Sequence, residues 1–449
     1  MLTENDNWEI WRWTGSVLFL AAMLFTIFLV AEHDMKMVTV EGFVQDIEDQ
    51  QGWAAGGNSL RRLAFLGCAG FGMLGLMMGQ WGRFRWNVPM VLFMVYVAWT
   101  GASVSWSIDF GASVRRYVLM LCCVIGCIGL TRFVTIEQVL IATMIAMLGW
   151  LLVGISAELY FGAFRPHDLE HRFAGTIHPN LQAANLAMVF FAAFTMSRIR
   201  PKLKWLLYAI MFVVFAFLLM TKCRTVVGVL PLAFLIIWLT TQPMQKVAIG
   251  SLAGIWMASS AAFVFLVIGF DPISEFSEVL LLGRGEETGS SLTGRLPLWK
   301  DLSGYIRGRP LHGYGFGAFW TPNHIYDIAK SQEWVISEAH SSYIDAILQI
   351  GLIGVLLLLS VAVSTFIQAV VAFRQTGRPE YIFIIGGVFF CLCRGFTESG
   401  LSEPAGFSSP LFLVMAANSW NPPLKQNTIS VSTKLNTRPE LNLQGTAND

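Results

Sequence analysis

Long apolar segments alternate with short polar connections along almost the whole chain of 449 residues. A helix needs about 20 apolar residues to cross the hydrocarbon core of a bilayer. Twelve segments approach this length, so the pattern predicts an all-α integral membrane protein with about 12 transmembrane helices. They lie near 14–31, 63–80, 88–105, 117–131, 136–157, 181–197, 205–221, 225–241, 247–270, 342–373, 381–397 and 405–419.

One long polar interval, residues 271–340, interrupts this pattern. After Pro297, apolar residues recur at helical spacing, which predicts a short amphipathic helix over 297–307 at the membrane surface. The segment 342–373 is long enough to tilt or to continue beyond the membrane. The chain is thus expected to form a membrane domain over 1–420 that carries one long loop. The tail, 421–449, lacks apolar periodicity and is predicted to be disordered.

The distribution of basic residues predicts the orientation in the membrane. With a cytoplasmic N-terminus, the short inner connections hold ten Lys and Arg in 30 residues, and the outer connections hold nine in 75. Cytoplasmic connections of membrane proteins are enriched in Lys and Arg. We therefore expect both termini in the cytoplasm and the loop 271–340 outside.

Composition excludes several functions. Hydrophobic residues make up 55% of the chain, charged residues 13%, and the net charge is +1, so no basic surface for nucleic acid is expected. The sequence contains no GxxxxGK[ST] motif, so ATP binding is not expected. Cys122, Cys123 and Cys127 lie within a predicted span without His or carboxylate, and no metal or cofactor is predicted.

Polar residues from five separate stretches are expected at the same outer membrane face. The hydropathy pattern that defines the spans does not depend on these residues, so their convergence at one face predicts a functional site. They are Arg172, His178, Arg224, Arg295, His340, Arg394 and Glu398.

Arg224 and Arg295 are the candidate anion-binding residues. Arg224 lies in a three-residue connection between two spans, where an arginine is costly unless it faces a cavity or an anion; the alternative is snorkelling to lipid headgroups. Arg295 begins the predicted amphipathic helix, where a cation opposes the helix dipole. Both facts fit a phosphate bound by guanidinium groups and helix amides, and a headgroup contact is the alternative for Arg295.

His340 is the candidate general base. A histidine at a helix start is expected to be neutral, since the dipole disfavours the imidazolium. Glu338 would not face it along a helix but could orient the ring in an extended segment.

Simpler interpretations apply to other residues at this face. Arg394 and Glu398 are spaced i,i+4, so they are expected to neutralise each other, and His178 could simply cap a span. The Gly-rich and aromatic stretch 312–320 predicts a turn with aromatic packing or, as an alternative, a sugar-stacking platform.

The residues quoted above resemble those of the O-antigen ligase and polysaccharide polymerase superfamily. The matching pieces cover roughly 165–400: Arg224 in Lys-Cys-Arg-Thr, Thr293-Gly-Arg-Leu-Pro-Leu-Trp299, the stretch 310–317, and Ala339-His-Ser-Ser-Tyr343. The resemblance implies a metal-independent, inverting membrane glycosyltransferase similar to the GT-C type. Its donor would be an undecaprenyl-diphosphate-linked glycan at the periplasmic face of the bacterial inner membrane.

By this likeness Arg224 and Arg295 hold the diphosphate and His340 activates the acceptor hydroxyl, a glycan or lipid-linked glycan. Arg172, His178, Trp299, Glu338, Arg394 and Glu398 are expected to support substrate binding. The likeness is greatest to exopolysaccharide polymerases, with partner flippases and chain-length regulators implied. An O-antigen ligase acting on lipid A core and a transporter of an anionic solute are the alternatives.

Overall fold

The computed structural model describes residues 14–24, 59–78, 87–130, 134–168, 171–252, 257, 295–332, 336–401 and 415–417. The predicted tail 421–449, residues 271–294 of the predicted loop and most of the segments 247–270 and 405–419 lie outside these residues. Regular structure in the described part is helical. The main helices are α4 (Ser59–Met78), α5 (Val88–Ala102), α6 (Phe110–Leu130), α7 (Ile136–Tyr160), α8 (Pro179–Ile199), α9 (Lys204–Met220), α10 (Arg224–Thr241), α14 (Arg295–Gly308), α15 (Pro322–Gln332), α16 (Ser342–Thr376) and α17 (Glu380–Arg394).

Six of the described helical segments are long and apolar enough to cross a membrane. They are Val88–Trp106, Phe110–Gly129, Ile136–Tyr160, Pro201–Met220, Arg224–Thr241 and Ser342–Thr376. The prediction of helical, membrane-spanning structure is therefore confirmed for the part of the chain that the structure describes, and the full number of twelve spans stays a prediction. The predicted amphipathic helix is present as α14, which buries Leu298 and Leu302 and exposes its opposite side.

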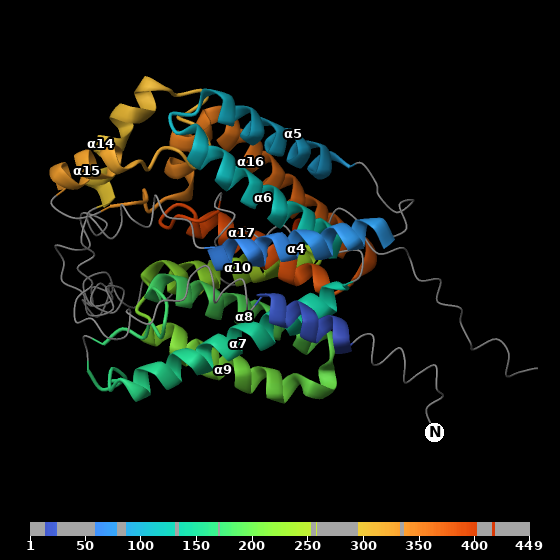
Figure 1. The fold of residues 1–449 in the computed structure, drawn as a ribbon. Helices are drawn as coiled ribbons and strands as arrows, with labels where there is room; N and C mark the ends of the chain where they lie inside the picture. The colour runs from blue at the N-terminus through green and yellow to red at the C-terminus, as the bar shows by residue number, and fades with distance from the viewer. Residues whose placement is uncertain are drawn as a thin grey trace, which may run out of the picture.

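The helices form two groups that α17 joins (Figure 1). One group contains α4, α5, α6 and α16, and the other contains α7, α8, α9 and α10. Helix α17 contacts α16 of the first group and both α8 and α10 of the second. Helices α14 and α15 lie together at one end of the bundle, where α14 packs against α16.

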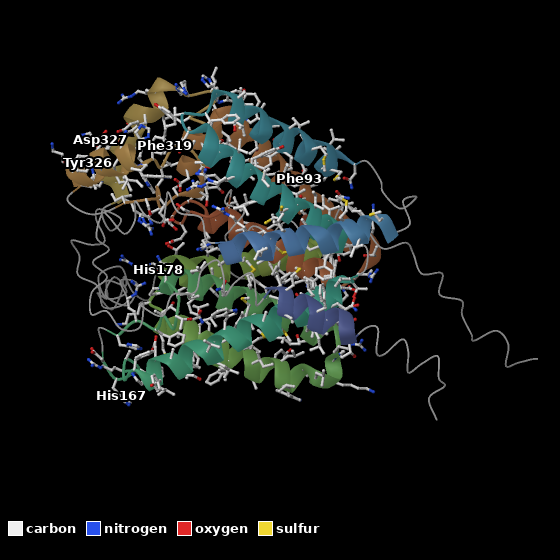
Figure 2. The ribbon with its side chains drawn as sticks, viewed as in Figure 1. Phe93, His167, His178, Phe319, Tyr326 and Asp327 are labelled. Carbon is white, nitrogen blue, oxygen red and sulfur yellow. The ribbon has the colours of Figure 1, made fainter. Side chains whose placement is uncertain are left out.

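Helix α8 is buried along most of its length, including the polar side chains of Gln182 and Asn185. Polar groups in the interior of a membrane bundle are expensive and face partners or cavities rather than lipid. Figure 2 shows His178, just before α8, toward the same end of the molecule as Tyr326 and Asp327 of α15.

Helix α16 is broken at Gly351, whose φ of 71° and ψ of −179° are not helical. The break frees backbone groups that would otherwise bond within the helix, and a segment we call the strap, residues 310–315, bonds to them. The bonds run from Tyr314 N to Leu348 O (2.8 Å), from Gly315 N to Gln349 O (2.9 Å) and from Leu352 N to Pro310 O (2.9 Å).

Glycine is needed on both sides of this contact. A Cβ on Gly351 would lie 2.1 Å from Leu311 O, and one on Gly313 would lie 2.6 Å from the carbonyl carbon of Gln349. Both glycines also have positive φ, which other L-residues rarely adopt. The Gly-rich stretch is thus a turn packed on a helix break. Phe316 is buried, so its ring is not available to stack on a sugar.

Candidate functional site

A chain of hydrogen bonds joins four polar residues at the α14 end of the bundle. Arg172 Nη2 donates to Asn180 Oδ1 (3.1 Å), Asn180 Nδ2 donates to Glu398 Oε1 (2.8 Å), and Arg295 Nη2 lies 2.9 Å from the same carboxylate oxygen. We call Arg172, Asn180, Arg295 and Glu398 the Glu398 cluster. Its members come from the loop before α8, from α8, from the start of α14 and from the segment after α17. The structure thus brings together residues that are far apart in the sequence.

Glu398 does not pair with Arg394, contrary to the prediction from their i,i+4 spacing. A backbone hydrogen bond from Glu398 N to Arg394 O (3.0 Å) spans the turn after α17, but the Glu398 side chain is directed to other elements. The carboxylate of Glu398, 8% exposed, instead accepts from Arg295 and Asn180. A buried carboxylate needs compensation by charge and hydrogen bonds, and the two donors supply it. Arg295 is therefore held by an internal anion.

His340 and Glu338 form a second pair beside this cluster. The imidazole Nδ1 of His340 lies 2.8 Å from Glu338 Oε1, and the two side chains are 25% and 41% exposed. The segment before α16 is not helical, and Glu338 contacts the ring from it. His340 itself has a φ of 50°, a region that non-glycine residues occupy at a cost.

The pKa of His340 shifts in the direction opposite to the one expected for a histidine at a helix start. Burial lowers the pKa of His340, but the hydrogen bond and charge of Glu338 outweigh burial and raise that pKa above its ordinary value of 6.5. The same pair lowers the pKa of the Glu338 carboxyl, although burial opposes this. An adjacent carboxylate at hydrogen-bond distance thus favours the imidazolium of His340, which a helix start alone would disfavour.

Several hydrogen bonds fix the segment that carries His340. Trp299 Nε1 donates to Ala339 O (2.8 Å), and Ala339 N donates to Asp345 Oδ1 (3.1 Å). Trp320 Nε1 donates to the same carboxylate (2.9 Å), and so does the hydroxyl of Ser399. Asp345 is 2% exposed and organises these donors. Trp299 thus holds the backbone next to His340.

Sequence reasoning missed Asp345. The available signal was a carboxylate inside the apolar segment 342–373, because an ionisable residue within a predicted span is a functional or structural candidate by default. Its role here is to tie the His340 segment to the first turn of α16.

Ser342 connects the His340 segment to the Glu398 cluster. Its backbone N–H donates to the carbonyl oxygens of Gly395 (2.8 Å) and Glu398 (3.1 Å), and its hydroxyl donates to Glu398 O (2.7 Å). The charges of both Arg295 and Glu398 act on His340. The candidate base and the arginine-carboxylate pair therefore share one electrostatic environment.

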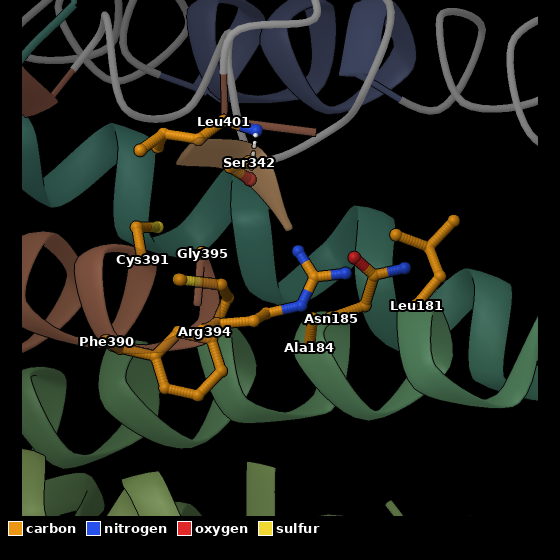
Figure 3. Close-up of a pocket in the computed structure, with 10 residues that line it drawn as sticks. Leu181, Ala184, Asn185, Ser342, Phe390, Cys391, Arg394, Gly395 and Leu401 are labelled. Atoms are coloured by element: carbon orange, nitrogen blue, oxygen red, sulfur yellow. Dashed lines mark hydrogen bonds between the residues drawn. The ribbon is translucent and has the colours of Figure 1, made fainter. Parts of the chain in front are cut away.

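His178, Arg224 and Arg394 border the same region. His178 is the N-cap of α8, and its Nδ1 accepts from Asn180 N (3.3 Å), so it does cap the helix. Arg224 is the first residue of α10, and the Thr225 hydroxyl next to it accepts from Thr397 (3.1 Å). Arg394 lines a small pocket between α8 and α17 (Figure 3).

The helical membrane fold and its cationic site define the class of protein. Residues 209–359, which include Arg224, Arg295 and His340, match the model of the O-antigen ligase family. Over this segment the chain is therefore similar to the O-antigen ligase family. Over 121 residues it is also 29% identical to the exopolysaccharide production protein ExoQ of Rhizobium meliloti (strain 1021). That match covers 26% of this chain and 28% of that protein's length.

Proposed function

We propose that this protein joins lipid-linked oligosaccharide repeat units into exopolysaccharide at the periplasmic face of the inner membrane. The observation that carries the proposal is the His340–Glu338 pair beside Arg295. All three residues lie in the segment that matches the O-antigen ligase family. The similarity to an exopolysaccharide production protein supports a polymerase rather than a ligase.

In the proposed reaction, a hydroxyl of the acceptor glycan attacks the anomeric carbon of the donor. The bond between that carbon and the diphosphate oxygen breaks, and the diphosphate leaves with the electron pair. His340 takes the hydroxyl proton as general base. Because its Nδ1 faces Glu338, the Nε2 atom is the one that receives the proton. A single displacement of this kind inverts the anomeric centre.

The arginines would stabilise the charge that develops on the leaving diphosphate. Arg295 presents a planar fork of donors suited to phosphate oxygens, and Arg172 and Arg224 add positive charge nearby. In the structure Arg295 is paired with Glu398. This contact uses one nitrogen of a guanidinium that has five N–H donors, so a donor phosphate could bind Arg295 beside Glu398.

The test is to incubate the purified protein with an undecaprenyl-diphosphate-linked repeat unit, without nucleotide and with a metal chelator. Ladders of repeat units on the carrier lipid are the expected result. Transfer to added lipid A core, without ladders, would show a ligase instead. No product with either acceptor would contradict the enzyme and leave transport of an anionic solute as the alternative.

A further inference from the structure

The carboxyl group of Glu158 lies near the end of α7 and takes no part in the proposed reaction. Glu158 is 3% exposed and stands in the last turn of the helix, which ends at Tyr160. An acidic side chain near a helix C-terminus opposes the helix dipole, and a buried charge is costly unless charges or hydrogen bonds compensate it. The side chain therefore needs partners that outweigh both costs.

The partners of Glu158 lie in the loop that leads from α7 to α8. Its Oε1 atom accepts hydrogen bonds from Ala174 N (2.9 Å) and Gly175 N (2.8 Å). Its Oε2 atom lies 3.5 Å from His171 Nε2, within the distance of an ion pair but without the geometry of a hydrogen bond. We call residues 171–175 the Arg172 arm. Glu158 thus contacts the arm at both ends, on either side of Arg172.

The Arg172 arm is packed tightly against the helices beside it. Gly175 has a φ of 64°, and a Cβ at this position would lie 2.7 Å from Gly154 Cα, so a larger residue would push the arm away from α7. Phe173 is buried, and its N–H donates to Met220 O (2.9 Å) at the end of α9. The arm is therefore fixed between α7 and α9.

Arg172 extends from the arm toward the Glu398 cluster. Its Nε atom donates to Thr221 O (3.2 Å), and its Nη2 atom donates to Asn180 Oδ1 (3.1 Å). Asn180 in turn donates to Glu398. These contacts hold only the guanidinium of a long and flexible side chain, whereas the position of its backbone is set by the contacts of the arm.

The end of α7 does not require the Glu158 side chain. The backbone carbonyl of Glu158 accepts from Ala163 N (2.8 Å) and Phe164 N (3.2 Å), and any residue at position 158 could make these bonds. The side-chain carboxylate, in contrast, makes its polar contacts with the Arg172 arm. Its role is therefore specific to the arm rather than to the helix.

We propose that Glu158 is a positioning residue that holds the Arg172 arm so that the Arg172 guanidinium reaches Asn180 and the Glu398 cluster. This inference rests on the proposed function, in which Arg172 adds positive charge beside the donor diphosphate. Glu158 contacts no substrate in this proposal. It acts through the two backbone N–H groups that it binds, and the consequence is an arginine whose position is set before the donor arrives.

A double-mutant cycle on the purified full-length protein tests this role. Its members are the natural protein, Glu158→Ala, Arg172→Gln and the double variant, with a lipid-linked repeat unit as substrate. Each single variant is expected to lower kcat/KM about tenfold, the scale of one charge-assisted hydrogen bond. The double variant should be no worse than Arg172→Gln alone, because the effects of residues that act through one another do not add.

The loss should appear in KM rather than in kcat, since Arg172 is proposed to bind the donor. A merely structural role of Glu158 would lower the amount of active protein, which reduces the apparent kcat and leaves KM unchanged. Glu158→Gln keeps an oxygen for the two N–H groups and should recover most of the loss in KM. Glu158→Met, which fills the same space without an acceptor, replaces Glu158→Ala in the cycle if that variant does not fold.

Glu137→Ala is the matched control. Glu137 lies in the first turn of α7, at the opposite end from Glu158, and pairs with Arg200 (2.8 Å). This variant removes an equal charge and an ion pair far along the helix from the Arg172 arm, so its kcat and KM should match those of the natural protein.

Binding of undecaprenyl diphosphate to the same proteins is a readout that needs no turnover. Glu158→Ala and Arg172→Gln should each weaken it about tenfold, and the double variant no further. This binding pattern without polymer synthesis would support the positioning role and contradict the proposed function.

Three results would overturn the positioning role even where the natural protein makes polymer. The first is a pair of losses that multiply in the double variant. The second is an unchanged KM in Glu158→Ala. The third is a Glu158→Gln variant as impaired as Glu158→Ala, which would show that the two backbone hydrogen bonds do not carry the effect.

Discussion

Arg295 Nη2 lies 2.9 Å from Glu398 Oε1, although the two residues are 103 positions apart in the chain. The pair joins the start of α14 to the segment after α17. It gives Arg295 two roles, because the guanidinium proposed to hold a phosphate also compensates a buried carboxylate. The two roles can be separated by mutation.

Arg295→Gln is expected to abolish polymer and to lower the stability of the protein by about 3 kcal/mol or less, because it leaves the Glu398 charge without its ion pair. In the double variant Arg295→Gln with Glu398→Gln, stability should recover while activity stays absent. Thermal unfolding in detergent and polymer yield in cells measure the two effects. Recovery of activity in the double variant would show that Arg295 serves only to compensate Glu398.

His340→Asn is expected to reduce glycosyl transfer by about 100-fold or more, since general bases contribute on this scale. Asparagine tolerates the positive φ that His340 adopts better than most residues, so the variant should still fold, with a small loss of stability from the missing His340–Glu338 pair. The initial rate with a lipid-linked repeat unit is the measurement. A variant with full activity would rule out His340 as the base.

The rate of transfer is expected to fall at acidic pH with a midpoint above 6.5. The base must be neutral, and Glu338 raises the pKa of His340 above that value although burial opposes it. Glu338→Gln removes the carboxylate that stabilises the imidazolium, so the midpoint should move to lower pH. A pH–rate profile of both proteins checks this, and a profile that does not move would mean that another group titrates.

The His340–Glu338 pair also makes the stability of the folded protein depend on pH. Because the pKa of His340 is raised by folding, its contribution is complete below pH 6.5 and is lost as pH rises through the pKa of the folded state. Glu338 has a lowered pKa, so its contribution is present above its ordinary value of 4.5 and is lost as pH falls further. The pair should therefore stabilise the segment most between these limits.

Asp345→Asn is expected to destabilise the protein by about 1–3 kcal/mol, because an amide replaces one carboxylate oxygen with a donor and leaves buried N–H or O–H groups unpaired. The His340 segment should loosen as well, with a loss of activity larger than the loss of folded protein. Asp327→Asn is the matched control, since Asp327 is exposed on α15. Equal behaviour of the two variants would contradict the anchoring role of Asp345.

Most helices could be predicted from the sequence because hydropathy is a local property. The segments 136–157, 205–221 and 225–241 agree closely with α7, α9 and α10. Helix α6 begins at Phe110, earlier than the expected residue 117. The prediction began too late because Arg115 and Arg116 interrupt the apolar segment. The Arg116 side chain bonds to Gly317 O, and this distant partner leaves no signal near residue 116.

The types of residue in the site could be predicted, but their pairing could not. Sequence spacing relates Arg394 to Glu398 because it considers only neighbours along one helix. The structure pairs Glu398 with Arg295 instead, a contact that depends on how α14 packs at the end of the bundle.

The break at Gly351 separates His340 mechanically from the membrane-spanning part of α16. The short helical segment before the break is bonded to the strap, and Ile350 O accepts from Trp99 Nε1 on α5 (2.9 Å), so its position does not depend on a continuous backbone ladder. A membrane helix adjusts its tilt to the thickness of the surrounding bilayer. In a continuous helix, such a tilt would change the orientation of the imidazole. Because of the break, the longer part of α16 after Gly351 can tilt while the His340 ring keeps its orientation.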